Sequence, residues 1–523
     1  MDTIRIEGLR SLVDTGDFPL KKLNVLVGTN SSGKSTFLRV FPLLRQSVER
    51  KTRGPILWSG NYIDFDSFGT SIYKAPPSNN KTGLRNPLLE LFDKNLTPIG
   101  NIKFSFNLNM GHESNKKPVY LSIHLSEIPK TQGCYTSRFI CMINKLQITF
   151  DFNKDGIITD VNSNVFSWPL EKHELKYQLT DTDTLVPVLS ADTPASLEHK
   201  SRQISTALRD QIKELLLKHS GSTSSDKANG LFIRLTRSIL DSEEKIKTMR
   251  FGFRTNKWRK TLTSWQDSHD DFIFIAGLID LYFIIENSSK INGLMTDHLL
   301  GVRYIAPLRT STQRYYRYQD ISIDELDHEG ENIAMFISNI SGNWREKLNN
   351  WTKEEFGFHI KENTSFGHTS ISIVDSQNEL SSNISDMGFG YSQVLPIIIQ
   401  LWSISSGYEN SKKRKKNLSF IFAIEQPELH LHPKMQAKLA RVFTKSIKLA
   451  EENNINIKII LETHSEAIVS KLGELILNND IERTDVAISC FEQDRKDRKT
   501  KITTSKFNES GRLSDWPLGF FDY

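Results

Sequence analysis

The feature that most constrains the fold is a glycine-rich motif close to the N-terminus. From Gly28 to Ser35 the sequence reads GTNSSGKS, which matches the phosphate-binding pattern GxxxxGK[ST] in full. The apolar run of residues 23–27 predicts a buried strand before the motif, and residues 36–40 predict a helix after it. This order of strand, loop and helix directs backbone N–H groups toward a phosphate, so it favours an α/β fold with a nucleotide site.

The residue types in the loop predict how ATP and Mg²⁺ would bind. Lys34 would reach the β- and γ-phosphates, and the Ser35 hydroxyl would bind Mg²⁺. A chance Gly/Ser loop is the alternative, and the flanking strand and helix argue against it. The predicted nucleotide-binding residues of this segment are Asn30, Ser31, Ser32, Gly33, Lys34, Ser35 and Thr36.

A second motif places carboxylates after a buried strand. The apolar residues 420–424 lead into Glu425, and Gln426 and Glu428 follow. A carboxylate beside a phosphate loop can hold Mg²⁺, so we predict that Glu425 is a metal ligand together with Ser35. Any strand followed by a polar turn is the alternative. Gln426 can orient a water but cannot accept its proton, which predicts slow hydrolysis unless Glu428 supplies the carboxylate.

Two further segments complete the predicted catalytic set. The apolar strand 459–461 ends near His464, which could contact the γ-phosphate or its attacking water, although a lone histidine is more often structural. Residues 385–393 read SDMGFGYSQ and precede an apolar helix, so they offer a second phosphate-binding surface or a plain Gly-rich turn. The predicted binding residues there are Ser385, Gly388, Gly390, Ser392 and Gln393.

The remaining pattern predicts three consecutive regions. Alternating residues at 104–108, 119–125 and 146–152 indicate antiparallel strands. We therefore expect a first ATPase lobe over 1–165, a helical insertion over 166–301 and a second ATPase lobe over 302–523, where strands and helices alternate.

Composition sets limits on the class of protein. The chain has 523 residues and a formal net charge of +5, which permits a nucleic-acid partner without requiring one. The longest apolar stretch, 272–285, contains Asp280 and is too short to span a bilayer, so we expect a cytoplasmic protein without a membrane segment. Three cysteines without CxxC spacing fit a reducing compartment.

Taken in order, the motifs resemble those of RecF/SMC/ABC-type ATPases. The similarity is closest to the overcoming-lysogenization-defect (OLD)-like branch without a TOPRIM domain, and to PtuA-type antiphage ATPases of Septu and retron systems. Glu425 to Pro433 resembles the extended Walker B and D-loop, and Glu462 to Ser465 resembles the switch histidine segment. Tyr304 to Arg309 and Trp516 to Phe521 also resemble family elements.

The resemblance implies an ABC-type head with a mixed sheet, an antiparallel β lobe and an inserted helical subdomain. It also implies a dimer or higher oligomer of this chain in which the signature loop of one subunit caps ATP bound to another. The expected role is an ATP-gated sensor or regulator of a partner HNH-type nuclease, with DNA or a reverse-transcribed DNA–RNA as a further partner. The alternatives are a RecF-like repair clamp and an ATP-binding scaffold without significant hydrolysis.

Two stretches that mix cations and aromatic residues are candidates for nucleic-acid contact. Cations neutralise phosphates, and aromatic rings stack on unpaired bases. Ordinary amphipathic surface is an equally good interpretation of each stretch. The candidate residues are Arg254, Lys257, Trp258, Lys260, Arg314 and Arg317.

Overall fold

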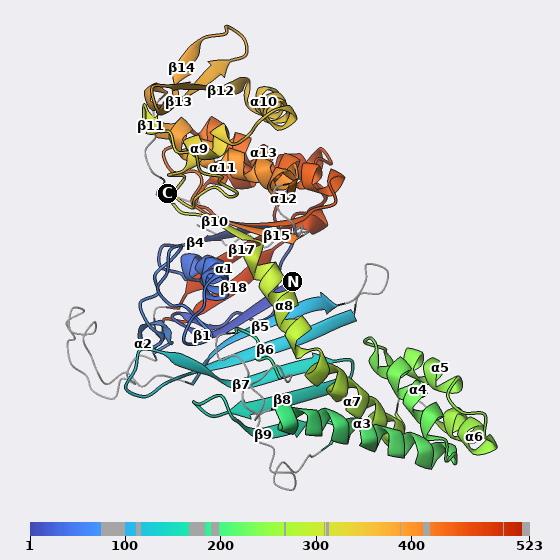
Figure 1. Cartoon of the computed structure of the whole chain (residues 1–523). Coiled ribbons are helices and arrows are strands. Elements are labelled where there is room, and N and C mark those ends of the chain that lie inside the picture. The colour runs from blue at the N-terminus through green and yellow to red at the C-terminus, as the bar shows by residue number, and fades with distance from the viewer. Residues whose placement is uncertain are drawn as a thin grey trace, which may run out of the picture. The chain divides into compact units, whose positions relative to one another are not determined.

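The computed structural model in Figure 1 divides into two compact units. Unit 1 consists of residues 1–19, 46–60 and 64–297, and unit 2 of residues 20–45, 61–63 and 298–523. The residues that the structure describes are 1–74, 100–110, 117–166, 184–189, 198–265, 268–307, 309, 313–387, 389–411, 419–494 and 496–514.

Unit 1 is built on an eight-stranded antiparallel sheet in the order β2-β1-β5-β6-β7-β8-β9, with β3 paired to β1. The alternation expected at 104–108, 119–125 and 146–152 is confirmed in β5, β6 and β8, where one residue in two faces the core. The strands are β1 (Thr3–Leu9), β2 (Leu12–Asp14), β3 (Phe18–Pro19), β5 (Ile102–Met110), β6 (Lys117–Glu127), β7 (Cys134–Ile143), β8 (Leu146–Phe152) and β9 (Ile158–Ser163).

The described helices of unit 1 begin with α2 (Phe68–Ser71) and continue after β9 as α3 (Glu198–Ser220), α4 (Ser225–Thr236), α5 (Ser242–Arg250), α6 (Asn256–Ser264) and α7 (Asp270–Glu286); α8 (Ser288–Leu300) leads into unit 2. Polar caps define the starts of the short helices. Asp241 and Glu244 form a capping box on α5, and Thr255 accepts from the Trp258 N–H at the start of α6. The apolar α7 packs against α3 and β8, so it is a core helix of unit 1.

Within the described residues, no single helix has the length and apolar composition of a membrane span. Among the residues that the structure describes, α7 and α8 taken together meet those two criteria, and they are bent by 62° at the break between them.

Unit 2 contains a six-stranded sheet in the order β10-β15-β16-β4-β17-β18, parallel except for β18. Its parallel strands read as continuous apolar runs because they are buried on both faces. The strands are β4 (Leu23–Gly28), β10 (Val302–Ile305), β15 (Ser419–Glu425), β16 (Asn456–Glu462), β17 (Val486–Gln493) and β18 (Thr500–Ser505).

The helices of unit 2 pack with this sheet and with a second, smaller sheet. Helix α13 contacts β16, α11 and α14. The helices are α1 (Lys34–Glu49, which continues past the unit boundary), α9 (Ile333–Ser338), α10 (Asn343–Phe356), α11 (Phe389–Ser405), α12 (Tyr408–Ser411), α13 (Pro433–Glu452) and α14 (Glu466–Leu477). The smaller sheet contains β11 (Tyr316–Arg317), β12 (Phe358–Ser365), β13 (His368–Asp375) and β14 (Ser381–Asn383).

The two units differ from the three consecutive regions expected from the sequence. Residues 20–45, which carry β4 and most of α1, belong with the C-terminal half because β4 pairs with β16 and β17. The described helices α3 to α7 belong with the antiparallel sheet in unit 1, since α7 packs on β8. The α/β fold with a mixed sheet, an antiparallel lobe and a helical subdomain is confirmed.

A buried ion pair ties the helical subdomain to the antiparallel sheet. Lys245 of α5 lies 2.8 Å from both carboxylate oxygens of Asp280 in α7, and the two side chains are 2% and 6% exposed. Asn144, in the turn between β7 and β8, donates to the same carboxylate at 3.1 and 3.2 Å. Three elements that are distant in sequence therefore share one carboxylate.

We predict that Lys245→Met destabilises unit 1 by about 3–5 kcal/mol, because it leaves the Asp280 charge buried without a cation. The double variant Lys245→Met with Asp280→Leu should recover most of that loss, since no unpaired charge remains. Urea unfolding followed by circular dichroism measures both. The exposed Lys247→Met is the matched control and should leave the midpoint unchanged. A single variant as stable as the wild type would contradict the prediction.

Candidate functional site

The phosphate-binding loop is held tightly between β4 and α1. Gly28 has φ +149°, and a Cβ there would lie 2.2 Å from the Phe491 carbonyl oxygen of β17, so no larger residue fits. Gly33 and Ser31 have φ values of 99° and 63°, which turn the chain into the helix. Thr500 of β18 donates to the Ser32 carbonyl oxygen at 2.8 Å and fixes the loop from the side.

Lys34 and Ser35, at the end of this loop, both direct their side chains inward. Lys34 is buried, and its Nζ donates to the carbonyl oxygens of Gly28 and Thr29 at 2.9 and 2.7 Å. Burial lowers the pKa of Lys34. The Ser35 hydroxyl donates to Glu462 Oε1 at 2.8 Å, which connects the start of α1 to the end of β16. Asn30 and Ser31 are exposed, and Thr36 is half-buried.

Three buried carboxylates gather at the carboxyl end of the parallel sheet. Glu425 and Glu462 are paired in register as the last residues of β15 and β16, and Glu428 follows three residues after Glu425. All three are less than 10% exposed. Burial, and then the charge of Glu425, raise the pKa of Glu462 from its ordinary value to about 7. Burial also raises the pKa of Glu428.

Glu425 is compensated by a cation and a hydroxyl. Arg39, one helical turn after Ser35, binds both carboxylate oxygens of Glu425 at 2.7 and 2.8 Å. The Tyr304 hydroxyl of β10 donates to Glu425 Oε1 at 2.8 Å. Burial, and then the negative charge of Glu425, raise the pKa of Tyr304, so this phenol remains a donor.

The segment after β15 is bound to the segment after β16 through backbone groups. The Gln426 N–H donates to the Glu462 carbonyl oxygen at 2.9 Å, and Gln426 has a left-handed φ of 40°. The His464 N–H donates to Glu428 Oε1 at 2.7 Å. The His464 ring is half-buried, and burial followed by the nearby charge of Lys34 lowers its pKa, so the imidazole is neutral at pH 7.

Several buried polar atoms around this site have no hydrogen-bond partner within the described part of the chain. They are Ser32 Oγ, Glu428 Oε2, Glu462 Oε2, and Nε and Nη1 of Arg309. Carboxylate and hydroxyl oxygens are the ligands that Mg²⁺ prefers, and a guanidinium binds phosphate. Unpaired buried groups of these types fit Mg²⁺ and a triphosphate, because each would gain a partner on binding.

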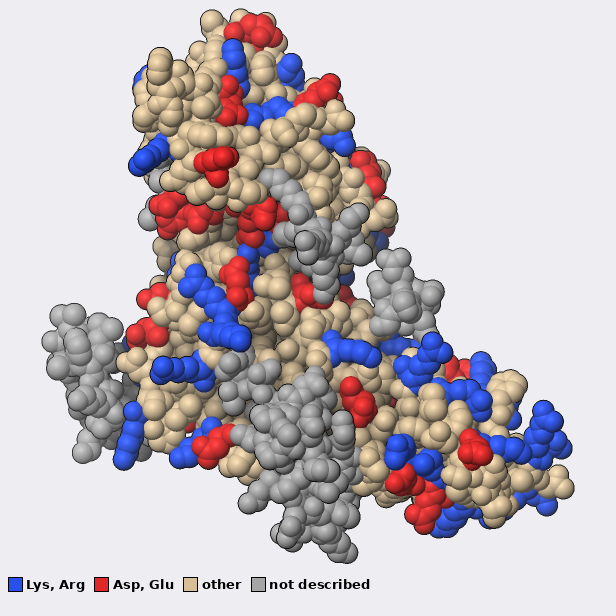
Figure 2. Space-filling view, in the orientation of Figure 1, with Lys and Arg blue, Asp and Glu red and all other residues tan. Residues whose placement is uncertain are grey.

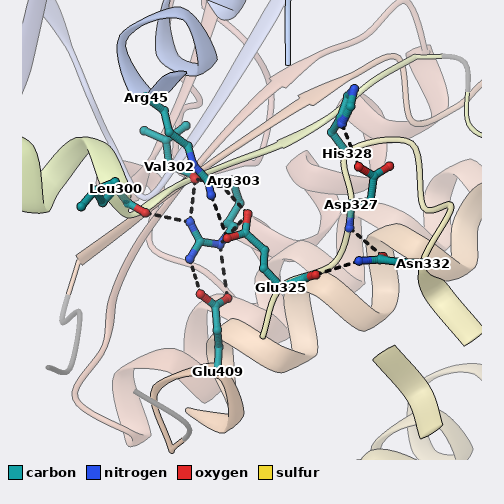
Figure 3. A network of polar contacts seen from close by, with 9 residues as sticks. All are labelled: Arg45, Leu300, Val302, Arg303, Glu325, Asp327, His328, Asn332 and Glu409. Atoms are coloured by element: carbon teal, nitrogen blue, oxygen red, sulfur yellow. Dashed lines mark hydrogen bonds and ion pairs between the residues drawn. The ribbon is translucent and has the colours of Figure 1, made fainter. Parts of the chain in front are cut away.

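A network of buried ion pairs fixes β10, the strand that carries Tyr304 (Figure 3). Arg303 pairs with Glu409 of α12 and donates to the Leu300 and Val302 carbonyl oxygens at 2.8 and 2.7 Å. Arg45 of α1 donates to the same Val302 oxygen at 2.6 Å and binds Glu325 with both of its Nη atoms. Helix α1 is therefore joined to β10 at the end that is distant from the phosphate loop.

The same network reaches Glu425 through an aromatic contact. The His328 ring stacks on the Tyr304 ring with centroids 6.1 Å apart, and its Nδ1 lies 3.2 Å from Asp327. Asn332 donates to the Glu325 backbone oxygen at 3.0 Å and holds this turn in place. Tyr304 thus contacts His328 through its ring and Glu425 through its hydroxyl.

The predicted signature residues lie at the start of α11. Ser385 is half-buried, and its hydroxyl donates to Asn383 Oδ1 at 2.8 Å. Ser392 is buried, and Gln393 Nε2 donates to the Arg309 carbonyl oxygen at 3.1 Å. A Cβ on Gly390 would meet Leu431 at 3.3 Å, so this helix start lies against the D-loop. Gly388 lies outside the described residues.

The structure corrects one of the nucleic-acid candidates. Trp258 is fully buried, its Nε1 donates to the Met249 carbonyl oxygen at 2.9 Å, and it packs edge-to-face on Phe253 and Trp265. The prediction that Trp258 stacks on bases is wrong, because its ring belongs to the core of the helical subdomain. Arg254, Lys257, Lys260 and Arg317 are exposed. Arg314 forms an ion pair with Asp386.

Four residues of the site were not among the sequence predictions. Arg39 could have been found from its i+4 spacing to Ser35, and Glu462 from its place at the end of an apolar strand. Tyr304 and Arg309 lie in a segment already noted for its family resemblance. Of the predicted residues, the structure brings together Lys34, Ser35, Glu425, Glu428 and His464 around the loop.

A protein-family match agrees with this geometry. The family described as AAA ATPase domain matches residues 1–469, and the chain belongs to it. A family described as protein of unknown function (DUF3696) matches residues 481–522. A search of curated proteins gives no significant match. Among solved structures, the SMC head domain from Thermotoga maritima is 8% identical with a TM-score of 0.35, covering 96% of this chain and 97% of that one. The family and the site support an ATP-binding ATPase.

We predict opposite effects of Glu462→Gln on stability and on function. The folded Glu462 carboxyl holds its proton more tightly than the unfolded one, so the wild type loses stability as pH rises from about 4.5 to about 7. At pH 8 the variant should therefore be more stable by on the order of 1–3 kcal/mol without nucleotide, with a smaller gain at pH 5. It should also bind Mg²⁺ and ATP more weakly.

Thermal unfolding at both pH values and titration with a fluorescent ATP analogue measure these effects. The exposed Glu466→Gln, at the start of α14, is the matched control and should change neither quantity. A Glu462→Gln variant that is less stable at pH 8, or that binds nucleotide as the wild type does, would contradict the assignment.

Proposed function

We propose that this chain binds Mg²⁺-ATP at the loop from Gly28 to Thr36, hydrolyses it slowly and associates with a second copy in an ATP-dependent manner. The observation that carries the proposal is the hydrogen bond between Ser35 and Glu462, next to the Glu425 carboxylate. It places a hydroxyl and two carboxylates on one side of a phosphate loop, in line with the AAA ATPase domain family.

Bound Mg²⁺ would neutralise charge on the phosphates and polarise the γ-phosphoryl group. The oxygen ligands proposed for it are Ser35 Oγ and Glu425, with Glu462 as an addition to the sequence prediction. Lys34 would neutralise the β- and γ-phosphates, and Arg39 keeps Glu425 in a fixed orientation. Two nitrogens of Arg309 have no partner among the described residues, and burial lowers the pKa of Arg309 to about 10, so a nearby anion would stabilise its charge.

We assign to Glu428 the role of receiving the proton of the attacking water. Gln426 can orient the water but cannot accept a proton. Glu428 Oε2 has no partner among the described residues, and burial raises its pKa, which improves a carboxylate as a base near pH 7. His464 is neutral, so it contributes one donor and one acceptor rather than a charge.

We assign to Ser385 the role of capping the ATP bound to the second copy. Ser392 is 3% exposed and faces the interior, whereas Ser385 and Asp386 are accessible at the start of α11. Small residues before a helix N-terminus form a phosphate-binding surface, which a second chain can complete. From the resemblance to PtuA-type ATPases, we propose that the chain acts as an ATP-gated sensor or regulator of a partner HNH-type nuclease in antiphage defence.

The alternative of an ATP-binding scaffold has one observation in its favour. The Gln426 side chain lacks the acidity of the glutamate common at this position, so ATP could drive association while turnover stays at background. Comparing the ATP turnover of the wild type with that of the Lys34→Ala variant distinguishes a slow ATPase from an ATP-binding scaffold.

Replacing Lys34 with alanine should reduce ATP turnover to below about one-hundredth of the wild-type value, because the charge that faces the β- and γ-phosphates is lost. Phosphate release and binding of a fluorescent ATP analogue are the measurements. Lys21→Ala, an exposed cation just before β4, should behave as the wild type. Normal turnover in Lys34→Ala would exclude this loop as the catalytic site, and background turnover in the wild type with intact ATP binding would favour the scaffold.

Mixing two inactive variants tests whether ATP is shared between copies. Lys34→Ala removes one half of the site and Ser385→Glu the other, so each alone should be inactive. Equimolar mixing should restore about a quarter of wild-type turnover, since half the dimers are mixed and each has one intact site. Mixing Lys34→Ala with Glu425→Gln is the control and should restore nothing, because both changes lie in the same half. No recovery with Ser385→Glu would refute the sharing.

A further inference from the structure

The helices α4, α5 and α6 carry a concentrated positive charge. Residues 225–265 contain ten Lys and Arg against four Asp and Glu, a net charge of +6, whereas the whole chain has a net charge of +5. Figure 2 shows Lys and Arg side chains grouped over the region where Figure 1 labels these helices. An excess of this kind on a small surface creates a local field that attracts polyanions.

Four of these cations are exposed and lack an acidic partner. Arg250, Arg254, Arg259 and Lys260 have no side-chain hydrogen bond or ion pair within the ranges that the structure describes. On the antiparallel sheet of the same unit, Arg5 and Arg138 are instead bound to aspartates. Arg250, Arg254 and Arg259 lie together on α5, α6 and their connection, where they line one groove.

A solvent-open groove of about 930 Å³ runs between α5 and α6. Its apolar lining includes Phe253, Leu262 and Trp265, and its cationic lining includes Arg250, Arg254 and Arg259. An apolar floor with a cationic rim suits a ligand that has flat apolar groups and regularly spaced negative charges.

An exposed aromatic ring lies beside this groove. Phe251 is 81% exposed and directly follows Arg250 at the end of α5. Arg234 donates to its backbone oxygen at 3.4 Å, which links the position to α4. A phenyl ring held in water next to unpaired cations matches the arrangement by which proteins stack on unpaired bases while neutralising the phosphates.

We propose that this groove binds single-stranded nucleic acid. The phosphates would follow Arg250, Arg254 and Arg259, and a base would stack on Phe251. The cations alone would also suit an acidic protein, but the exposed ring and the apolar floor favour a ligand with bases. The proposal concerns unit 1 alone and does not depend on the nucleotide site of unit 2 or on hydrolysis.

The test is fluorescence anisotropy of the full-length protein with a labelled oligothymidylate of about 30 nucleotides, over a KCl titration and without ATP. The triple variant Arg250→Gln, Arg254→Gln and Arg259→Gln should bind at least about tenfold more weakly, and the slope of log K against log salt should fall by about 2, at about 0.7 per phosphate contact. Phe251→Ala should weaken binding about fivefold or more without changing the slope.

Arg53, Lys130 and Lys154 provide a control of equal charge, because they are exposed cations outside α4 to α6 in the same unit. Their triple glutamine variant should bind as the wild type does. Circular dichroism of each variant confirms folding, and surface substitutions at exposed positions should preserve it.

Four outcomes would overturn the proposal. Wild-type protein that does not bind the oligothymidylate at low salt excludes it. A triple arginine variant with wild-type affinity and slope places binding elsewhere. Polyglutamate that competes as well as DNA, together with a silent Phe251→Ala, would show that the groove recognises an acidic protein. A duplex of equal length that binds more tightly than the single strand would exclude base stacking.

Discussion

The rest of the nucleotide site depends on keeping three carboxylates buried side by side. Glu425, Glu428 and Glu462 lie at one edge of a parallel sheet, where isolated charges are costly. Arg39 and Tyr304 compensate Glu425, a backbone N–H compensates Glu428, and the Ser35 hydroxyl compensates Glu462. The compensating groups come from three places in the fold: α1 supplies Arg39 and Ser35, β10 supplies Tyr304, and the turn after β16 supplies the backbone N–H. The requirement to neutralise these acids therefore fixes α1, β10, β15 and the turn after β16 together. The carboxylate oxygens without a partner among the described residues, Glu428 Oε2 and Glu462 Oε2, could then bind a cation.

The ion pairs around Arg303 explain how β10 can serve this site from the edge of the sheet. Edge strands are held by hydrogen bonds on one side only, so they shift more easily than central strands. Arg303 and Arg45 bind carbonyl oxygens at the start of β10 and also bind acids of two other segments. A buried pair of this type adds little net stability but defines one arrangement, because breaking it leaves a charge without a partner. Here the ion pairs of Arg303 and Arg45 fix the position of Tyr304.

Much of the site could be predicted from the sequence, because the relevant signals are local. The phosphate loop, the strand before Glu425 and the helix capped by Ser465 each appear as an apolar run next to a specific polar residue. The contacts of Arg39 and Arg309 could not be predicted, since they depend on which elements the sheet order brings together. Trp258 shows the opposite error: cations surround it in sequence, but the capped helix α6 turns its ring toward Phe253 and Trp265. The division into units was also unpredictable, because β4 pairs with strands more than 430 residues later.

The central place of β4 has a consequence for the order in which the protein forms as it leaves the ribosome. The antiparallel partners of β1 lie within about the first 110 residues, so that sheet can begin to form early in synthesis. Strand β4 has no neighbours in its own sheet until β16 and β17 have been translated. The nascent chain must therefore carry the exposed apolar segment of residues 23–27 through most of its translation. Closing contacts over such sequence separations is slow, so the competence to bind ATP arises only after β16 and β17 have joined β4.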